Sequence, residues 1–238
     1  MTDGRLIVAL DFHSADDAKK LVETLGDNVN FYKVGMELFY AVGPDIVRWL
    51  KAQNKNVFLD LKLHDIPNTV AQGLCSLLDL GVDILNVHAS GGFTMMKTAA
   101  DQLKLRAEQL GVPRPKLIAI TVLTSINDAD WNDLGWQSNM TNQAVRLARL
   151  ALKAGLDGVV ASPKEAQSIR QACGDQFLII TPGIRPAGAS IDDQSRIATP
   201  SSAIKNGADY LVVGRPIRAA NDPKAAAQSI LSEISVRR

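Results

Sequence analysis

The sequence predicts a single (β/α)8 barrel domain over residues 1–238, and two observations support this fold class. Strand-like and helix-like segments alternate along the whole chain with short connections. In addition, polar and charged side chains recur where the predicted strands end. The strand-like segments are continuous apolar runs rather than alternating ones, which is typical of strands buried on both faces. They are Leu6–Leu10, Phe31–Gly35, Val57–Leu63, Ile84–His88, Leu117–Leu123, Gly158–Ala161, Phe177–Thr181 and Tyr210–Val213.

Helix-like segments follow each predicted strand. They lie near residues 15–25, 38–53, 68–80, 93–109, 141–154, 163–172, 200–206 and 217–235. Ser14 and the pair Ser162-Pro163 suit helix starts. Four of the helical patterns are followed by a glycine, the residue favoured at helix C-termini, at Gly81, Gly111, Gly155 and Gly207. Two longer connections, 125–140 and 182–201, have the length of binding loops or lids.

The polar residues at the strand ends distinguish a barrel from a doubly wound open sheet, which the same number of repeats would also suit. In a closed barrel the carboxyl ends of all strands converge on one mouth, where the active site lies. We therefore expect these side chains to meet there. They are Asp11, Lys33, Asp60, Lys62, His88, Thr124, Thr181 and the pair Gly214-Arg215.

The composition excludes several classes of protein. Hydrophobic residues make up 46% of the chain, charged residues 21%, and the formal net charge is +1, which predicts no nucleic acid or anionic membrane as a partner. No apolar run approaches the roughly 18 residues of a membrane span. The first residues lack the apolar core of a signal peptide, and Cys75 and Cys173 form no Cys-x-x-Cys unit. We expect a cytoplasmic protein without a structural metal.

The most informative segment is the run from Asp60 to Thr69, with the sequence DLKLHDIPNT. It begins inside a predicted strand, Asn56 to Leu63, where residues two apart share a face, so Asp60 and Lys62 should project the same way. Charged side chains are rarely buried in a strand unless they are paired. A buried structural ion pair would explain these two residues, but it does not explain Asp65 directly after the strand.

Lys33 lies within the apolar run Phe31–Gly35, where its side chain either reaches outward to solvent or points into a polar barrel mouth. Beside Asp60, Lys62 and Asp65 it would extend an alternating array, Lys–Asp–Lys–Asp, so we favour the mouth. Opposite charges would keep both amines protonated and both carboxylates ionised. Such an array provides a fixed electric field and a protonated amine as general acid.

A second group of residues predicts an anion site. Gly214-Arg215 follows the last strand and precedes Pro216, and backbone N–H groups at a helix start combined with a guanidinium bind phosphate well. The alternative is a turn glycine beside a surface arginine. The preceding loop favours the anion site, because Arg185 and Gln194 could close over a phosphate beside Arg215.

His64 and His88 could suggest a metal site together with Asp60 and Asp65. However, a lysine lies between the two carboxylates, and no His-x-His or His-x-x-x-His pair is present. We therefore interpret both histidines as structural and predict no metal ligands. The chain also lacks the glycine-rich nucleotide motifs of Rossmann and P-loop proteins.

The run Asp60 to Thr69 resembles the signature of the orotidine 5′-phosphate decarboxylase family. The resemblance extends over essentially the whole chain, and the chain is similar to the bacterial, single-activity form. The short Asp-x-Lys-x-x-Asp core alone is weak, because related metal-dependent barrels share it, but the full ten-residue form is specific. The other matching motifs are Val8–Asp11, Lys33–Gly35, Thr121–Ser125, Thr181–Arg185 and Val213–Arg215.

The resemblance implies conversion of orotidine 5′-monophosphate to UMP and carbon dioxide in pyrimidine biosynthesis, with no metal and no cofactor. Lys62 would donate the proton to C6, and Asp60 would lie beside the substrate carboxylate. Lys33 and Asp65 would complete the array and contact the ribose hydroxyls.

The resemblance also implies substrate-binding residues and a partner. Asp65 and Thr69 would reach the active site of a second subunit, so that the enzyme is a homodimer with shared sites. Asp11 would bind ribose and Thr124 the pyrimidine edge. The phosphate would be held by Gln194, Gly214 and Arg215, with Arg185 in the loop beside them.

Two alternatives stay open at this point. A magnesium-dependent decarboxylase or aldolase of sugar phosphates could use the same barrel, and its activity would disappear on chelation. A non-catalytic ligand-binding barrel would keep the phosphate residues but would not need the Asp60–Lys62 pair.

Overall fold

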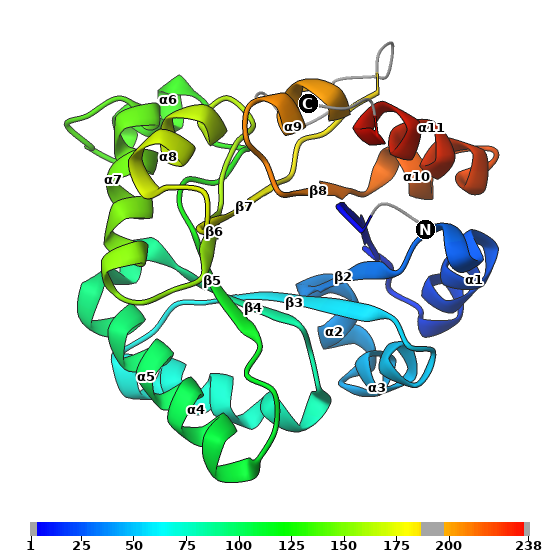
Figure 1. The fold of residues 1–238 in the computed structure, drawn as a ribbon, viewed down its shortest axis with the longest axis horizontal. Helices are drawn as coiled ribbons and strands as arrows, with labels where there is room; N and C mark the ends of the chain where they lie inside the picture. The colour runs from blue at the N-terminus through cyan, green and yellow to red at the C-terminus, as the bar shows by residue number, and fades with distance from the viewer. Residues whose placement is uncertain (1–3, 187–197, 236–238) are drawn as a thin grey trace.

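The computed structural model describes residues 4–186 and 198–235. Across these residues, eight parallel strands pair in sequence order, and the last pairs with the first, so the sheet closes into a barrel with the helices outside it (Figure 1). The predicted (β/α)8 fold is confirmed. The strands are β1 (Leu6–Ala9), β2 (Phe31–Gly35), β3 (Asn56–Leu63), β4 (Ile84–His88), β5 (Lys116–Ile120), β6 (Gly158–Val160), β7 (Leu178–Thr181) and β8 (Tyr210–Val213).

The helices cover the outside of the barrel, and α1 and α11 lie side by side where the ring closes (Figure 1). They are α1 (Ala15–Leu25), α2 (Met36–Val42), α3 (Asp45–Ala52), α4 (Pro67–Ser76), α5 (Gly92–Leu110), α6 (Asp128–Asp133), α7 (Met140–Lys153), α8 (Ala166–Cys173), α9 (Pro200–Lys205), α10 (Arg215–Arg218) and α11 (Pro223–Ser235). Within the described chain, none of them combines the length and the apolar character needed to cross a membrane.

Four of the predicted helices differ from the structure. The segment 68–80 is α4 followed by a short 3₁₀ helix, Leu78–Leu80. The segment 38–53 is two helices, because Gly43 has a φ of 73° and Pro44 follows it, and together they end α2 and redirect the chain. The segment 217–235 is also two helices, with α10 starting earlier, at Arg215. The helix predicted near Pro163 begins three residues later, at Ala166, after a turn.

The fifth strand is shorter than predicted and ends at Ile120 instead of Leu123. The chain then leaves the barrel wall into the long connection 125–140, in which α6 was not predicted. Asn127 caps this short helix by accepting hydrogen bonds from two backbone N–H groups. The connection also packs internally, since Trp131 is buried and its ring centroid lies 5.2 Å from that of Trp136.

Two separate cores stabilise the barrel. The larger one lies between the outer faces of the strands and the helices. The smaller one consists entirely of strand residues and fills the inside of the barrel: Ile7, Ala9, Phe31, Phe58, Ile84, Ile118, Ile180 and Val212. Because side chains alternate between these two cores, the next inward positions toward the carboxyl ends include Lys33, Asp60 and Asn86.

The amino end of the barrel carries a repeated ion-pair motif. The sequence Gly-x-Asp directly precedes β4, β6 and β8, at Gly81–Asp83, Gly155–Asp157 and Gly207–Asp209. Each aspartate accepts a backbone N–H from the neighbouring strand at 2.7–2.8 Å, and each also pairs with a cation at 2.6–2.7 Å. The cations are Lys51, Arg114 and Arg170, respectively. These contacts fasten adjacent strands together.

Candidate active site at the carboxyl end of the barrel

Four charged side chains form an alternating chain of ion pairs at the carboxyl end. Lys33 Nζ lies 3.1 Å from Asp11 Oδ1 and 3.3 Å from Asp60 Oδ2. Lys62 Nζ lies 2.7 Å from the other Asp60 oxygen, Oδ1. Gly35, directly above Lys33 on β2, leaves room for this amine, because a Cβ there would lie 2.9 Å from Nζ. The predicted convergence of Asp11, Lys33, Asp60 and Lys62 on one mouth is confirmed.

The array is buried and remains charged. The side chain of Asp60 is 9% exposed and that of Lys33 is 11% exposed. Burial by itself would raise the pKa of Asp60, but Lys33, Lys62 and a hydrogen bond from Asn86 hold the pKa below its usual value. Burial would likewise lower the pKa of Lys33, but the carboxylates of Asp60 and Asp11 hold it above its usual value. At neutral pH the mouth therefore contains an ionised carboxylate between two ammonium groups.

The alternation of side chains along a regular strand does not account for the contact between Asp60 and Lys62, because β3 is irregular here. Lys62 has a φ of 53°, in the left-handed region that residues with a Cβ rarely adopt. The pairing of β3 with β4 also shifts between Leu59 and Leu63, which marks a bulge in β3. The bulge and the left-handed residue re-aim the side chain, and they place the Lys62 amine directly on the Asp60 carboxylate.

Asn86 is a site residue that the sequence reasoning missed. It lies on β4, is fully buried, and its Nδ2 donates to Asp60 Oδ1 at 2.6 Å. Its Oδ1 accepts the backbone N–H of Lys62 at 2.8 Å. The signal was an amide within the apolar run Ile84–His88, two residues from His88 and so on the same face.

A small cavity of about 170 Å³ adjoins the array. One wall carries the charged groups of Lys33, Asp60 and Lys62. The remaining walls are mostly apolar, and they are provided by Phe58, Ile120, Val122, Leu123, Val160, Pro182 and Val212, together with Thr124. A flat ring held against such walls would present one edge to the ammonium groups in a water-poor environment, where fixed charges act most strongly.

The predicted phosphate residues lie on the segments that follow β7 and β8. Gly214 and Arg215 begin α10, and a Cβ at Gly214 would lie 3.5 Å from Asp11 Oδ2, so this turn borders the array. Arg185 is buried and its Nη1 donates to the carbonyl of Ile184. Gln194 lies outside the described residues. Thr181 is fully buried and its hydroxyl donates to a neighbouring strand, so it belongs to the barrel wall.

Asp65 does not join the array within its own chain, contrary to the expected order Lys–Asp–Lys–Asp; Asp11 occupies the end of the array instead. Asp65 is exposed, its Oδ1 accepts the N–H of Ile66, and it forms no ion pair with any described residue. Thr69, one turn along α4, is also exposed. Both residues face outward at the mouth.

The two histidines lie close together, with ring centroids 5.3 Å apart. Burial lowers the pKa of His88, and His64 and Lys62 lower it further. Over residues 4–186 and 198–235, no three His, Cys, Asp or Glu side chains form a group suited to a metal ion. Both Asp60 oxygens already contact an ammonium group, which makes the array a poor donor set for a cation.

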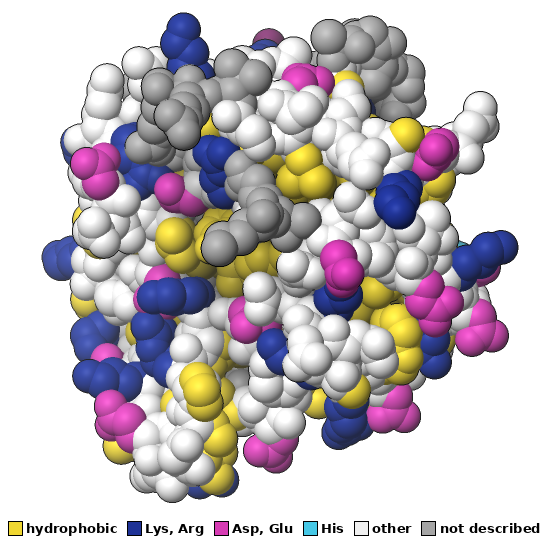
Figure 2. All heavy atoms as spheres, turned by 45° about the vertical axis from the view of Figure 1, so that its right-hand side comes forward, with side chains coloured by type: hydrophobic (Ala, Val, Ile, Leu, Met, Phe, Trp, Pro, Cys, Tyr) yellow, Lys and Arg dark blue, Asp and Glu magenta, His cyan; other side chains and the backbone are white. Residues whose placement is uncertain are grey.

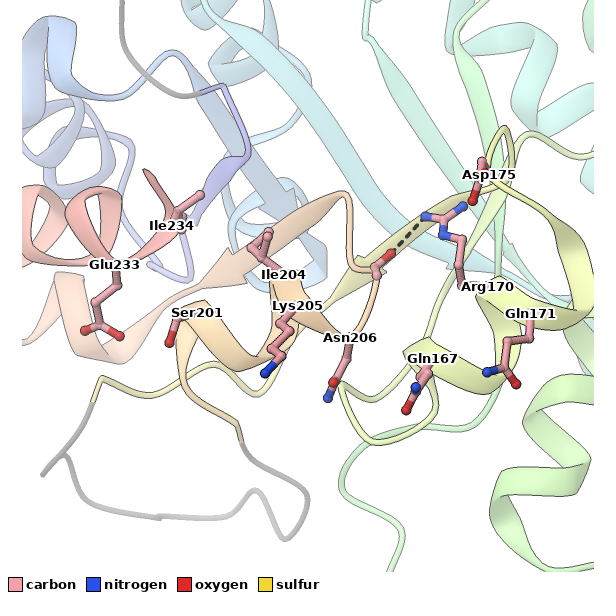
Figure 3. A pocket seen from close by; sticks show the side chains of 11 residues that line it. Gln167, Arg170, Gln171, Asp175, Ser201, Ile204, Lys205, Asn206, Glu233 and Ile234 are labelled. Carbon is pink, nitrogen blue, oxygen red and sulfur yellow. Dashed lines mark hydrogen bonds between the residues drawn. The ribbon is translucent and has the colours of Figure 1, made fainter. Parts of the chain in front are cut away.

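A larger hollow of about 640 Å³ lies elsewhere, between α8, α9 and the end of α11 (Figure 3). Its most prominent cation, Arg170, is already held by three backbone carbonyls and by Asp209. The hydrogen bond from Arg170 to the carbonyl of Gly207 is drawn in Figure 3. This arginine therefore stabilises the fold, and the convergent charges at the barrel mouth are the better candidate for chemistry.

Comparisons with known proteins identify the family of the chain. The model of the orotidine 5′-phosphate decarboxylase / HUMPS family matches residues 4–230. An orotidine 5′-phosphate decarboxylase of Moorella thermoacetica is 50% identical over 233 residues, which is 98% of this chain and 92% of that protein.

Solved structures give the same result. Orotidine 5′-phosphate decarboxylase from Lactobacillus acidophilus has a TM-score of 0.86 at 43% identity, covering 98% of this chain and 100% of that one. Orotidine 5′-phosphate decarboxylase from Pyrococcus horikoshii has a TM-score of 0.75 at 26% identity, covering 96% of this chain and 98% of that one. The chain belongs to the orotidine 5′-phosphate decarboxylase / HUMPS family.

Proposed function

We propose that this protein converts orotidine 5′-monophosphate to UMP and carbon dioxide in pyrimidine biosynthesis, without a metal or an organic cofactor. The observation that carries the proposal is the Lys62 amine, 2.7 Å from the Asp60 carboxylate at the wall of a mostly apolar cavity. The relatives that bear the name of this enzyme match nearly the whole chain.

The chemical difficulty is the carbanion left on C6 of the pyrimidine. When the bond between C6 and the carboxylate breaks, the electron pair stays on C6 and carbon dioxide departs. The Lys62 ammonium stabilises this developing charge and then donates its proton to C6, and solvent later restores the proton on the amine. Asp60, held ionised by Lys33 and Lys62, lies beside the departing carboxylate and keeps the proton donor in place.

Binding residues surround this centre. Thr124 contacts the pyrimidine edge, and Asp11 and Lys33 contact the ribose. Gly214, Arg215, Arg185 and Gln194 hold the phosphate at the segments that follow β7 and β8. The phosphate is remote from C6, but its binding energy can be used to hold the reacting ring in place against the ammonium groups.

The active unit is a homodimer in which each site borrows Asp65 and Thr69 from the other subunit. In support, Asp65 is exposed and forms no ion pair with the described residues of its own chain. Large apolar side chains are also exposed on the segments that follow β2 to β5, as expected of a surface that another subunit covers. They are Met36 (41%), Tyr40 (70%), Ile66 (67%), Phe93 (37%) and Leu123 (39%).

The direct test is to mix the purified protein with orotidine 5′-monophosphate and to follow the change in ultraviolet absorbance, with and without a metal chelator. We expect stoichiometric formation of UMP that is unaffected by the chelator. Activity that disappears on chelation would instead favour a magnesium-dependent enzyme of the same barrel. Binding without any turnover would favour a non-catalytic barrel.

The cytoplasmic location and the absence of a nucleic-acid partner stay predictions. On the face drawn in Figure 2, Lys and Arg side chains are interspersed with Asp and Glu side chains, which is in keeping with a protein that has no nucleic-acid partner. Electrostatic recognition of nucleic acid would favour a continuous basic patch.

A further inference from the structure

The bulge in β3 leaves a backbone group that needs a partner. From Leu59 to Leu63, β3 advances four residues, whereas its pairing on β4 advances two, from Leu85 to Val87. Such a bulge removes regular ladder hydrogen bonds around the extra residues. Buried backbone N–H groups are almost always paired, so the N–H of Lys62 must find an acceptor outside the ladder.

Asn86, directly opposite the bulge, provides that acceptor and binds the reactive carboxylate as well. Its Oδ1 accepts from the backbone N–H of Lys62 at 2.8 Å, and its Nδ2 donates to Asp60 Oδ1 at 2.6 Å. The orientation of the amide is forced, because the N–H of Lys62 can only donate and an ionised Asp60 can only accept. An asparagine offers one acceptor and one donor in this fixed arrangement at every pH, whereas an aspartic acid of similar size does so only while it is protonated.

We propose that Asn86 is a positioning residue for decarboxylation, which fixes the left-handed backbone of Lys62 and the orientation of the Asp60 carboxylate with a single amide. This inference rests on the proposed function. Asn86 itself is fully buried and is not among the residues that line the cavity, so it acts through Lys62 and Asp60 rather than on the substrate.

The physical reason is the strain at Lys62. A residue with a Cβ at a φ of 53° is held there by its surroundings. Without the amide of Asn86, the Lys62 N–H would lose its partner and the backbone could relax toward the extended conformation. The ammonium would then move away from C6, and a displacement of about 1 Å in a catalytic group can cost about 100-fold in rate.

The titratable side chains nearest to Asn86 lie on β2, β3 and β4. From β3, Asp60 and Lys62 bind it directly, and Lys33 on β2 reaches it through Asp60. His88 lies two residues along β4. On the other side, β5 presents Ile118 and Ile120, which do not titrate.

The test compares Asn86→Leu with Asn86→Asp across a range of pH. Asn86→Leu should lower kcat about 100-fold at every pH, with a much smaller change in KM. In Asn86→Asp, burial and the neighbouring Asp60 raise the pKa of the new carboxyl group by up to about 3–5 units. When protonated, that group can donate to Asp60 and accept from the Lys62 N–H, as the amide does. Its kcat relative to wild type should therefore rise as the pH falls.

Val87→Ala is the matched control, since Val87 is the next residue on β4 and is fully buried toward the helices. It should lower stability without changing the pH profile of kcat. A wild-type pH profile for Asn86→Asp, or a kcat for Asn86→Leu no lower than that of Val87→Ala, would overturn the inference. If Asn86→Leu does not fold, Asn86→Asp decides alone. An inactive wild type in the same assay would contradict the proposed function instead.

Discussion

Both ends of the barrel carry carboxylates paired with cations, but the two ends are built differently. At the amino end, Asp83, Asp157 and Asp209 each have a cation and a backbone N–H from their own chain. At the carboxyl end, Asp60 lies between two ammonium groups beside an open cavity. Asp65 forms no ion pair with the described residues there.

The difference shows how similar ion pairs can serve stability in one place and chemistry in another. Pairs that satisfy both partners and fasten neighbouring strands contribute to the free energy of folding. An array that faces a cavity and requires a left-handed lysine instead concentrates charge where a substrate can use it. Substitutions of matched residues at the two ends should therefore affect different measurements.

The largest effect is expected from the lysines. Lys62 and Lys51 both lie 2.7 Å from a carboxylate, at the carboxyl end and the amino end, respectively. Lys62→Ala should lower kcat by at least about 10⁴-fold, because it removes the proton donor, while UMP still binds. Lys51→Ala should leave kcat unchanged and cost about 1 kcal/mol in the free energy of unfolding. Steady-state kinetics and urea unfolding of both variants check this, and near-normal turnover by Lys62→Ala would refute the assigned role.

The arginines should give the next largest effect. Arg215→Ala should lower kcat/KM for orotidine 5′-monophosphate by about 100-fold, because charge-assisted hydrogen bonds to an anion are worth about 1.5–3 kcal/mol. The same substitution should lower kcat/KM for orotidine, which lacks the phosphate, by a much smaller factor. Arg114→Ala, at the amino end, should change kcat/KM for neither substrate. Equal losses on the two substrates would mean that Arg215 is a structural residue.

A smaller effect, on stability alone, is expected at Asp157. Its carboxylate binds Arg114 through two hydrogen bonds of 2.7 and 2.8 Å and accepts the N–H of Leu117. Asp157→Asn should therefore lower the free energy of unfolding by about 2 kcal/mol at neutral pH and leave kcat unchanged. Urea unfolding measures the first quantity. A change in kcat without a change in stability would contradict the division between the two ends.

The same variant should show a specific pH dependence. Burial would raise the pKa of Asp157, but the hydrogen bonds from Arg114 and Leu117 hold it below its ordinary value of 3.8. The contribution of this carboxylate to stability is thus complete above pH 3.8 and is lost as the pH falls through the lower folded value. The difference in stability between wild type and Asp157→Asn should shrink in acid over that window. A difference that is constant down to strongly acidic pH would mean that the charge of Asp157 does not contribute.

Much of the fold could be predicted because its signals are local. Each strand is a continuous apolar run, and each charged residue of the array interrupts or ends such a run. Even the break between α2 and α3 had a visible signal, since glycine followed by proline ends a helix. The early end of β5 had no such signal in the sequence. The apolar residues Val122 and Leu123 are typical of a strand, but they line the cavity.

The parts that could not be predicted depend on how strands pair. The role of Asn86 follows from a bulge in β3, and a bulge is a relation between two strands that neither sequence segment reveals alone. The Gly-x-Asp repeat was visible in the sequence. The cations that its aspartates bind, however, lie 32 to 43 residues away along the chain. The expected place of Asp65 was wrong within one chain for a different reason. Asp65 lies beyond the end of β3, where strand periodicity no longer predicts which way a side chain points.

The claim that the carboxyl end is completed by a second subunit is tested most directly by mixing two inactive variants. Lys62→Ala and Asp65→Ala homodimers each carry one lesion in every site, so each should be inactive. After joint unfolding and refolding, random pairing makes about half of the molecules heterodimers. In these, one site should hold both lesions and the other none, so about a quarter of the wild-type activity should return. If Asp65 serves its own chain, every site keeps one lesion, and a mixture whose heterodimers are verified by mass would stay inactive.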